Sequence, residues 1–347
     1  MTLSETCPAA PLPDLPAPAS DAGDLVEVDA ALLTALDRLP PRVRPVAAYH
    51  MGFDPDTCRD LRTRHRGKAL RARLALAAAR GGPEPRRAIT AAVAVELLHG
   101  FSLLHDDIMD GDRTRRGRPA AWVAYGTPAA LLAGDALMTL ALRVLTDTGD
   151  IAAVDAGVRV MDALVRGQSD DLAFEDERHI TVDAYVAMAA GKTGALTAAA
   201  CELAALLAGA PAVAVEALER FGRHAGIAFQ IADDVLGIWG DPRRTGKPVG
   251  GDLAARKKTL PVVAALHAAG REAGRLRDLL DTDSTLDAAQ TREATALIEA
   301  LGGHAAAHTL AQHHLGCALN ALYGCDLPPE ASDGLRALAR RMATRSH

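Results

Sequence analysis

The sequence predicts an all-α protein built as a single antiparallel helix bundle. Of its 347 residues, 49% are hydrophobic, which is enough to bury a substantial core, but only 3% are aromatic. The long segments rich in Ala, Leu and Val contain few β-branched runs, and this composition favours packed helices over sheet. Short breaks rich in Gly and Pro separate these segments, and none is long enough to divide the chain into domains.

The elements follow from this pattern in chain order. Residues 1–27 are rich in Pro, Ala and acidic residues and show no apolar period, so they predict an extended disordered tail. From residue 28 to residue 347 we expect one domain of about ten helices joined by short loops. The breaks expected to end these helices are Gly81-Gly82-Pro83, Gly126-Thr127-Pro128, Gly149-Asp150, Gly209-Ala210-Pro211, Gly240-Asp241-Pro242 and Gly302-Gly303.

Charge and cysteine usage exclude several classes of protein. The net charge of −6 argues against a nucleic-acid-binding protein, because phosphate contacts need a basic face. The five cysteines are widely spaced and form no CxxC pair, which indicates neither a disulfide framework nor a zinc site and fits the cytoplasm. The longest uncharged apolar run, Leu203–Val215, is too short to cross a bilayer, so no transmembrane segment is predicted.

A first aspartate-rich stretch, Asp106-Asp107-Ile108-Met109-Asp110, lies in an apolar helical segment, where carboxylates are costly unless they hold cations. Asp106 and Asp110 are one turn apart and share a helix face, whereas Asp107 is turned about 100° away. Hard oxygen ligands suit Mg²⁺, which is usually shared between a few carboxylates and substrate phosphates. Taken alone, the motif also fits a solvated acidic helix end.

A second aspartate-rich stretch, Asp233-Asp234-Val235-Leu236-Gly237, is followed by Asp241. Around it, amide, ammonium and carboxylate side chains alternate over a short distance: Gln230, Lys247, Asp252, Lys257 and Lys258. A two-part acidic site with several cations suits a diphosphate leaving group whose departure must be stabilised electrostatically.

Basic residues near the first stretch indicate a bound anion. Arg115 and Arg116 follow Asp110 closely and place guanidinium groups beside the carboxylates. Upstream, Lys68, Arg71 and His99 are each more often a solvated charge or a satisfied histidine, but together they could form a second, metal-free phosphate pocket. Two further polar pairs occur at short spacing: Lys192 with Thr193, and Gln168 with Asp171.

In their order, these motifs resemble those of the trans-isoprenyl diphosphate synthases. The matching segments are Leu104-His105-Asp106-Asp107-Ile108-Met109-Asp110, Arg115-Arg116-Gly117, Gly191-Lys192-Thr193, Phe229-Gln230-Ile231-Ala232-Asp233-Asp234, Gly246-Lys247-Pro248 and Lys257-Lys258-Thr259-Leu260-Pro261. The resemblance covers the chain from about residue 30 to its end. It implies a bundle around a deep central cavity, the isoprenoid synthase type I fold, which is usually dimeric and condenses isopentenyl diphosphate with an allylic diphosphate.

The resemblance also implies a role for each matching residue. Five carboxylates would hold Mg²⁺ on the allylic diphosphate: Asp106, Asp107, Asp110, Asp233 and Asp234. Four cations would help to bind that diphosphate: Arg115, Lys192, Lys247 and Lys257. Four side chains would bind the isopentenyl diphosphate: Lys68, Arg71, His99 and Arg116. Four more would line the reacting centre: Thr193, Gln230, Gln168 and Asp171.

Product length depends in this family on the cavity floor below Asp106. Ser102 lies one turn below on the same face, and Phe101 lies roughly 7.5 Å below along the helix axis. The bulk of Phe101 argues for a short product, whereas the small Ser102 permits more depth, so geranylgeranyl diphosphate is slightly favoured over farnesyl diphosphate. One departure from the family is Gly237, which stands where a third aspartate is common, although Asp241 lies just beyond it.

Two alternatives come from other classes of function. A class I terpene cyclase uses the same kind of bundle, but its usual Asn/Ser/Glu metal motif is not found in this sequence. A catalytically silent partner of another synthase is the second alternative, which the intact first motif opposes. The Pro-rich tail and the segment from Leu39 to His50 also look similar to actinobacterial synthases associated with encapsulin shells, so an encapsulin partner is a further hypothesis.

Overall fold

The computed structural model describes residues 21–53, 69–240, 250–281, 285–323 and 325–344. It is 79% helical, and the predicted all-α class is confirmed. The longer helices are α1 (Asp21–Leu36), α4 (Ala88–Met109), α6 (Thr127–Thr146), α7 (Ile151–Asp176), α9 (Ala195–Leu207), α10 (Ala212–Trp239), α14 (Arg271–Leu280), α15 (Ala288–Ala300), α16 (Gly303–Ala321) and α17 (Pro329–Thr344). The shorter segments are α2 (Arg44–His50), α3 (Leu70–Ala78), η2 (Ala79–Gly81), η3 (Pro85–Arg87), β1 (Thr114–Arg115), β2 (Arg118–Pro119), α5 (Ala121–Tyr125), α8 (Val182–Ala189), η4 (Ala190–Gly194), α12 (Gly251–Ala254) and α13 (Leu260–Leu266).

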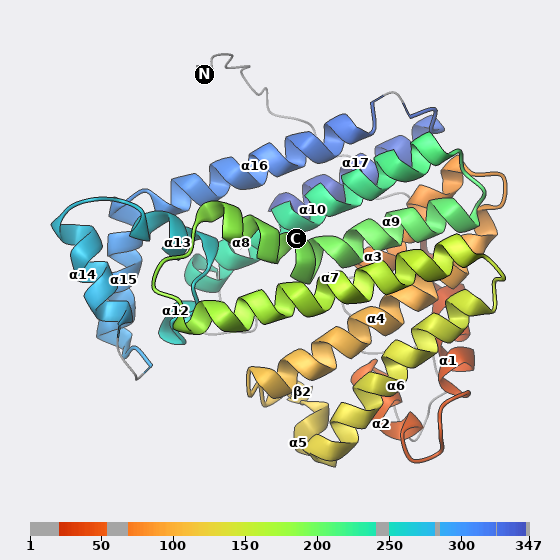
Figure 1. Cartoon of the computed structure of the whole chain (residues 1–347), viewed down its shortest axis with the longest axis horizontal. Helices are drawn as coiled ribbons and strands as arrows, with labels where there is room; N and C mark the ends of the chain where they lie inside the picture. The colour runs from red at the N-terminus through yellow and green to blue at the C-terminus, as the bar shows by residue number, and fades with distance from the viewer. Residues whose placement is uncertain (1–20, 54–68, 241–249, 282–284, 324, 345–347) are drawn as a thin grey trace.

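The long helices α4, α6, α7, α9, α10 and α16 run side by side and form the body of the molecule (Figure 1). Helix α9 packs against α3, α4, α7 and α10, while α4 also packs on α6 and α10 on α16. The largest hydrophobic cluster fills the space between these helices, with fully buried side chains such as Leu97, Leu98, Leu137, Leu203 and Phe221. The connections between successive helices are short, which is typical of antiparallel neighbours in a bundle.

The Gly and Pro breaks of the sequence coincide with helix boundaries. Helix α6 begins directly after Gly126 and carries Pro128 in its first turn, where the missing N–H is not needed. Helix α7 begins after Asp150, whose carboxylate accepts hydrogen bonds from the N–H groups of Ala152 and Ala153. The predicted break at Gly302 separates α15 from α16.

The predicted end of the N-terminal tail at residue 27 needs correction. Helix α1 already begins at Asp21, so residues 21–27 belong to the bundle. Leu25, Val28 and Leu32 form a buried apolar stripe with helical spacing, so this period starts at Leu25, three residues before the predicted start at Val28. The rest of the predicted tail, residues 1–20, lies outside the described residues.

Two helical stretches of the described chain, Pro85–Met109 and Thr127–Thr146, have the length and hydropathy of a membrane span. They contain α4 and α6, which pack against each other, and 61% and 44% of their most apolar windows are buried inside the bundle. Packing in the core accounts for the apolar character of these helices, because a core helix of a globular protein meets the same criteria.

Candidate active site

A cavity of about 710 Å³ opens between α4, α7, α9 and α10. Most of the predicted site residues that the structure describes line it: Arg71, His99, Phe101, Ser102, Asp106, Asp110, Arg115, Arg116, Gln168, Lys192, Thr193, Gln230, Asp233, Asp234 and Lys257. Asp107 and Asp171 lie behind its wall. The predicted residues Lys68 and Lys247, and Asp241, lie outside the described residues. The structure therefore brings both aspartate-rich stretches and the basic groups to one cavity.

Both aspartate-rich stretches lie at the C-terminal ends of long helices. Asp106 lies in the last turn of α4, which Asp110 caps, and Asp233 lies in the last turns of α10. Negative charge is unfavourable at this end of a helix, because the backbone carbonyl groups already carry partial negative charge there. Partial burial and the charge of Asp106 also raise the pKa of Asp110 to about 6. The cluster therefore needs neighbouring cations.

Lys192 supplies the nearest positive charge to α4. Its Nζ atom lies 3.0 Å from Asp106 Oδ1 and 2.5 Å from Asp171 Oδ2. Lys257 Nζ lies 3.6 Å from the same oxygen of Asp171. Burial alone would raise the pKa of Asp171, but these two ammonium groups outweigh that effect and lower it. Asp171 therefore contacts two lysines that line the cavity, while its own side chain is not part of the lining.

The segment that carries Lys192 and Thr193 is a π-helix, Ala190–Gly194, between α8 and α9. Single π turns inside helices are rare and occur frequently at functional sites. Two glycines allow this segment to approach α7: a Cβ atom on Gly167 would lie 2.2 Å from the backbone N of Lys192, and one on Gly191 would lie 2.8 Å from the backbone O of Ala163. The backbone of the π turn thus packs closely against α7, and Lys192 and Thr193 line the cavity.

Asp107, predicted as a metal ligand, lies beside the cavity in contact with Arg115. Its side chain is only 1% exposed, and its Oδ1 atom accepts a hydrogen bond of 2.6 Å from Arg115 Nε. Burial raises the pKa of Asp107, while Arg115 partly offsets this effect. The buried ion pair fixes the hairpin that follows α4 and leaves the cavity to Asp106 and Asp110.

Asp234, also predicted as a metal ligand, is likewise held by the protein. Its carboxylate accepts hydrogen bonds from Tyr185 Oη, from the backbone N–H of Leu260 and from Gln230 Nε2, the latter two at 2.9 Å. Gln230 in turn accepts a bond of 2.6 Å from the Thr193 hydroxyl. This network orients Thr193 and Gln230 in the cavity wall. Tyr185 was not predicted, because no motif connects it to α10 in the sequence.

Gly237, the departure from the family pattern, has a structural explanation. A Cβ atom at Gly237 would lie 2.0 Å from Oδ2 of Asp252, which comes from α12 and lines the cavity. The space that a third aspartate of the second stretch would occupy is thus filled by another carboxylate. In the sequence, Asp241 is the nearest aspartate after Gly237, whereas Asp252 comes close to Gly237 only through folding.

The basic side of the cavity depends on a small hairpin that the sequence did not predict. Strands β1 and β2 pair Arg115 with Arg118, and the two turn residues, Arg116 and Gly117, have φ values of 51° and 74°. Positive φ at both central residues is the geometry of a type I′ turn. The hairpin is anchored to α2 because Arg118 donates to the carbonyl of Tyr49 and lies over its ring. Arg116 thereby reaches the cavity.

Two neutral histidines accompany these arginines. His99 Nε2 lies 3.1 Å from Arg71 Nη1, and burial together with Arg71 and Arg116 lowers its pKa well below the usual value. His50, which follows Tyr49 and is buried, was not predicted; burial, then Arg116 and Arg115, lower its pKa to about 3. Burial, and after it the local positive field, lower the pKa of both imidazoles and favour their neutral form, which leaves the positive charge of this side of the cavity on the arginines.

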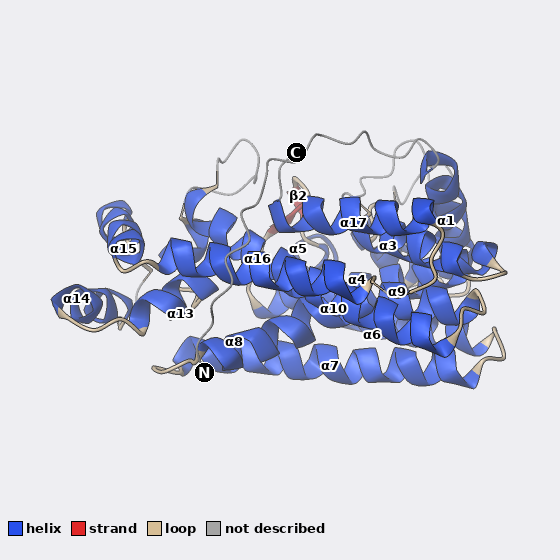
Figure 2. Ribbon diagram, turned by 90° about the horizontal axis from the view of Figure 1, so that it is seen from above, coloured by secondary structure: helices blue, strands red, loops and turns tan. Residues whose placement is uncertain are grey.

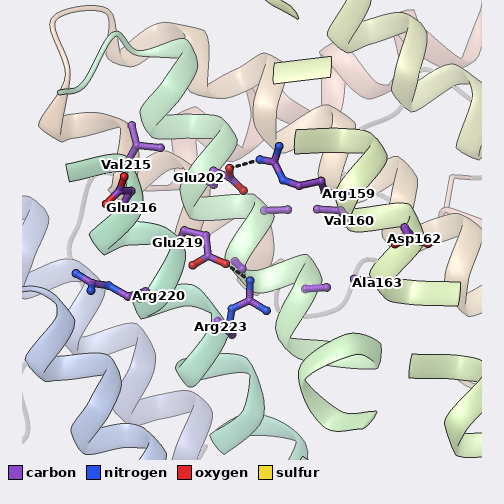
Figure 3. A pocket seen from close by; sticks show the side chains of 13 residues that line it. Arg159, Val160, Asp162, Ala163, Glu202, Val215, Glu216, Glu219, Arg220 and Arg223 are labelled. Atoms are coloured by element: carbon purple, nitrogen blue, oxygen red, sulfur yellow. Dashed lines mark hydrogen bonds and ion pairs between the residues drawn. The ribbon is translucent and has the colours of Figure 1, made fainter. Parts of the chain in front are cut away.

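A second hollow of about 600 Å³ lies between α7, α9 and α10 (Figure 3). Its arginines Arg159 and Arg223 are already paired with Glu202 and Glu219 on its own walls. Of the predicted site residues that the structure describes, none lines this hollow. The larger cavity is therefore the candidate active site.

The fold and this cavity define a class: helical-bundle enzymes that act on diphosphates through carboxylates at two helix ends. The family model of the polyprenyl synthetases matches residues 58–298, and the chain belongs to this family. It is 43% identical over 317 residues to a (2E,6E)-farnesyl diphosphate synthase of Mycobacterium bovis, covering 89% of this chain and 88% of that protein. It is also 43% identical over 293 residues to a geranylgeranyl diphosphate synthase of Mycobacterium tuberculosis, covering 83% of each.

Solved structures give the same result. A polyprenyl synthetase from Streptomyces coelicolor superimposes with a TM-score of 0.85 at 39% identity, covering 93% of this chain and 98% of that one. A polyprenyl synthase from Caulobacter crescentus, solved with calcium and isoprenyl diphosphate, gives 0.82 at 28% identity, covering 96% and 100%. The protein is a prenyltransferase, a short-chain prenyl diphosphate synthase.

The low pKa of His50 predicts acid sensitivity. In the unfolded chain this histidine binds a proton below pH 6.5, whereas in the folded protein it does so only near pH 3. Above pH 6.5, His50 is neutral in both states and does not affect stability. Between pH 7 and pH 5, only the unfolded chain takes up a proton at His50, so the free energy of unfolding should fall by about 2 kcal/mol. Denaturant titrations at both pH values should show a smaller drop for His50→Asn than for the parent.

An NMR titration of the His50 imidazole separates this effect from other titrating groups. The ring should stay neutral down to pH 5 in the folded protein. Protonation near pH 6.5 would contradict the burial that the structure shows for this side chain.

Proposed function

We propose that the protein catalyses the Mg²⁺-dependent condensation of isopentenyl diphosphate with an allylic diphosphate. The observation that carries this proposal is the division of one cavity into a carboxylate side and a guanidinium side. Asp106, Asp110 and Asp233 lie on the first side, and Arg71 and Arg116 on the second. One side suits a diphosphate bound through a cation, and the other suits a diphosphate bound directly by arginine.

The donor set of the carboxylate side fits Mg²⁺. It consists of hard oxygen atoms, and among the described residues no three His, Cys, Asp or Glu side chains converge into a complete metal cage. This incomplete set is what Mg²⁺ uses, because the ion keeps several waters and shares a few carboxylates with substrate phosphates. Asp106, Asp110 and Asp233 would hold the ion. Mg²⁺ bound there would neutralise the charge that develops on the departing diphosphate.

The protein's own groups divide the remaining tasks. Lys192 and Lys257, held by Asp171, would bind the allylic diphosphate and stabilise its departure as a leaving group. Arg71, Arg116 and neutral His99 would hold isopentenyl diphosphate, with its double bond directed at the resulting allylic cation. Gln168 Nε2 is buried and has no hydrogen-bond partner among the described residues, so it is free to face the reacting centre.

We propose geranylgeranyl diphosphate as the favoured product over farnesyl diphosphate. Phe101 is buried and makes an edge contact with His105 at 5.0 Å, which supports a firm lower boundary on α4. Ser102 lines the cavity beside it and donates its hydroxyl to the carbonyl of His99, so its polar group does not obstruct a hydrocarbon chain. The named relatives include both farnesyl and geranylgeranyl synthases.

Turnover with defined substrates tests the function. We expect the purified protein to convert isopentenyl diphosphate and an allylic primer into one dominant prenyl diphosphate with Mg²⁺ present, and to lose this activity with EDTA. Mass spectrometry of the products from dimethylallyl, geranyl and farnesyl primers gives the chain length. Absence of any condensation would favour the silent partner, and a cyclised hydrocarbon would favour the terpene cyclase.

We also propose that Asp252 supplies the carboxylate that Gly237 lacks. Asp252→Asn should lower kcat/KM by roughly 10- to 100-fold, most strongly at low Mg²⁺, as expected when a group beside a metal is removed. Gly237→Asp alone should also impair activity, because its side chain would collide with Asp252. The double variant Gly237→Asp/Asp252→Gly returns one carboxylate to the same space and should recover activity relative to either single variant.

A matched control for this exchange is Asp278→Asn, which changes an exposed aspartate on α14. It should leave the Mg²⁺ dependence unchanged. A double variant that is no better than Gly237→Asp alone would show that the two positions do not share a role.

We also propose that the enzyme is a cytoplasmic homodimer. An encapsulin shell is a further proposed partner. The tail composition supports the shell, and co-expression of the full chain and of residues 21–347, which keep helix α1 whole, with a shell protein would test it. The full chain should be enclosed and the shortened chain should not. Equal enclosure of both would contradict a role for the tail.

A further inference from the structure

Helix α7 carries exposed apolar side chains at intervals of seven residues. Ile151, Val158, Val165 and Leu172 are 81%, 47%, 60% and 36% exposed. Seven residues are close to two helical turns, so these side chains form one stripe with a spacing of about 10.5 Å. A heptad stripe is the pattern with which a helix packs along another helix at a small angle. Figures 1 and 2 show α7 on the outer face of the molecule, where no described helix of the chain covers this side.

The same stripe reaches the active-site cavity. Val165 and Leu172 both line the cavity, as does Met109 of α4, which is 44% exposed. On α7, the cavity wall therefore includes apolar side chains that are also open to solvent, and Val165 is the more exposed of the two. A growing prenyl chain that contacts Val165 would remain partly in contact with water, which costs roughly 25 cal/mol for each Å² of apolar surface left uncovered. The wall is incomplete in a single copy.

A second copy of the chain fits this face because the stripe is self-complementary. Its midpoint lies between Met161 and Asp162, so an antiparallel copy of α7 related by a twofold axis would place Val158 opposite Val165 and Ile151 opposite Leu172. Isologous pairing of this kind is the commonest form of dimer.

The charges beside the stripe permit such an approach. Asp155 pairs with Arg159 on the same helix, and Asp162 pairs with Arg166, so the margins present matched charges. Two further exposed apolar side chains, Leu131 and Leu132, extend the face onto α6, which packs against α7. The apolar face therefore spans two adjoining helices.

We propose that the partner subunit completes the hydrocarbon wall of the cavity, and that the partner's Val158 limits product length by packing against Val165. This inference rests on the proposed synthase function and on the proposed homodimer. It assigns a specificity role to a residue that does not line the cavity of its own subunit. Product length is then set by Phe101 from within one chain and by Val158 from the other.

A mixed dimer tests this assignment. An intact subunit and a subunit inactivated by Asp106→Asn and Asp110→Asn would carry different tags and be purified together as the full-length pair. Only one cavity of this dimer is active, so each substitution can be placed either in the active chain or across from it. Products are then measured by mass spectrometry.

With Val158→Trp in the inactive chain, the ratio of the longest product to the next shorter one should fall by about tenfold, since one misplaced group in an apolar pocket gives discrimination of this order. Val158→Ala in the inactive chain should shift the products toward longer chains. The same substitutions in the active chain should leave product length unchanged. Phe101→Ala, in contrast, should lengthen the product only when it is placed in the active chain.

The matched control is Val213→Trp, because Val213 is 71% exposed on α10. It should change neither assembly nor product length. Analytical ultracentrifugation of each pair confirms that the dimer persists, and Val158→Ala tests the assignment if the larger tryptophan prevents pairing.

Three outcomes would overturn the proposal: a monomeric parent protein, an effect of Val158 that appears only in the active chain, or no effect of either Val158 substitution from the inactive chain of an intact dimer. Failure of the proposed function is a different result, because the parent dimer would then make no prenyl diphosphate from any primer while still sedimenting as a dimer.

Discussion

The structure depends on an electrostatic problem at the ends of two helices. Helices α4 and α10 both end in carboxylates, where burial, like charges and the backbone carbonyl groups all disfavour negative charge. Cations from other elements of the fold compensate this negative charge. Lys192 comes from the π-helix, Lys257 from the segment after α12, and Arg115 from the hairpin. Each of these segments places a positively charged side chain beside the carboxylates at the end of a long helix.

The fold could be predicted from the sequence further than the site could. Helical spacing correctly placed Asp106 and Asp110 on the cavity face and Asp107 away from it, and the breaks at Gly126 and Gly302 coincide with helix boundaries. These features depend on residues that are close together in the chain. The start of α1 at Asp21 was missed because an acidic, alanine-rich segment has the same composition in a first helical turn as in a tail.

The roles of individual carboxylates could not be predicted, because they depend on partners distant in the chain. Asp234 is held by Tyr185, 49 residues earlier, and by the backbone of Leu260, 26 residues later. Motif spacing gives no information about such contacts. The closeness of Asp252 to Gly237 could not be predicted for the same reason, because it depends on how α12 packs against α10.

The carboxylates therefore divide into two groups with different physical tasks. Asp107, Asp171 and Asp234 are each engaged by groups of the protein, Asp107 through Oδ1 alone, and they contact Arg115, the two lysines and Gln230 of the Thr193–Gln230 pair. Asp106, Asp110 and Asp233 face the cavity. Fixed charges stabilise a departing diphosphate without reorganising during the reaction, so the first group prepares the field in which the second group acts. With the proposed Mg²⁺ and diphosphate bound, the second group would gain the compensating charge that it lacks in the empty protein, so the energy that these carboxylates cost would favour binding of both.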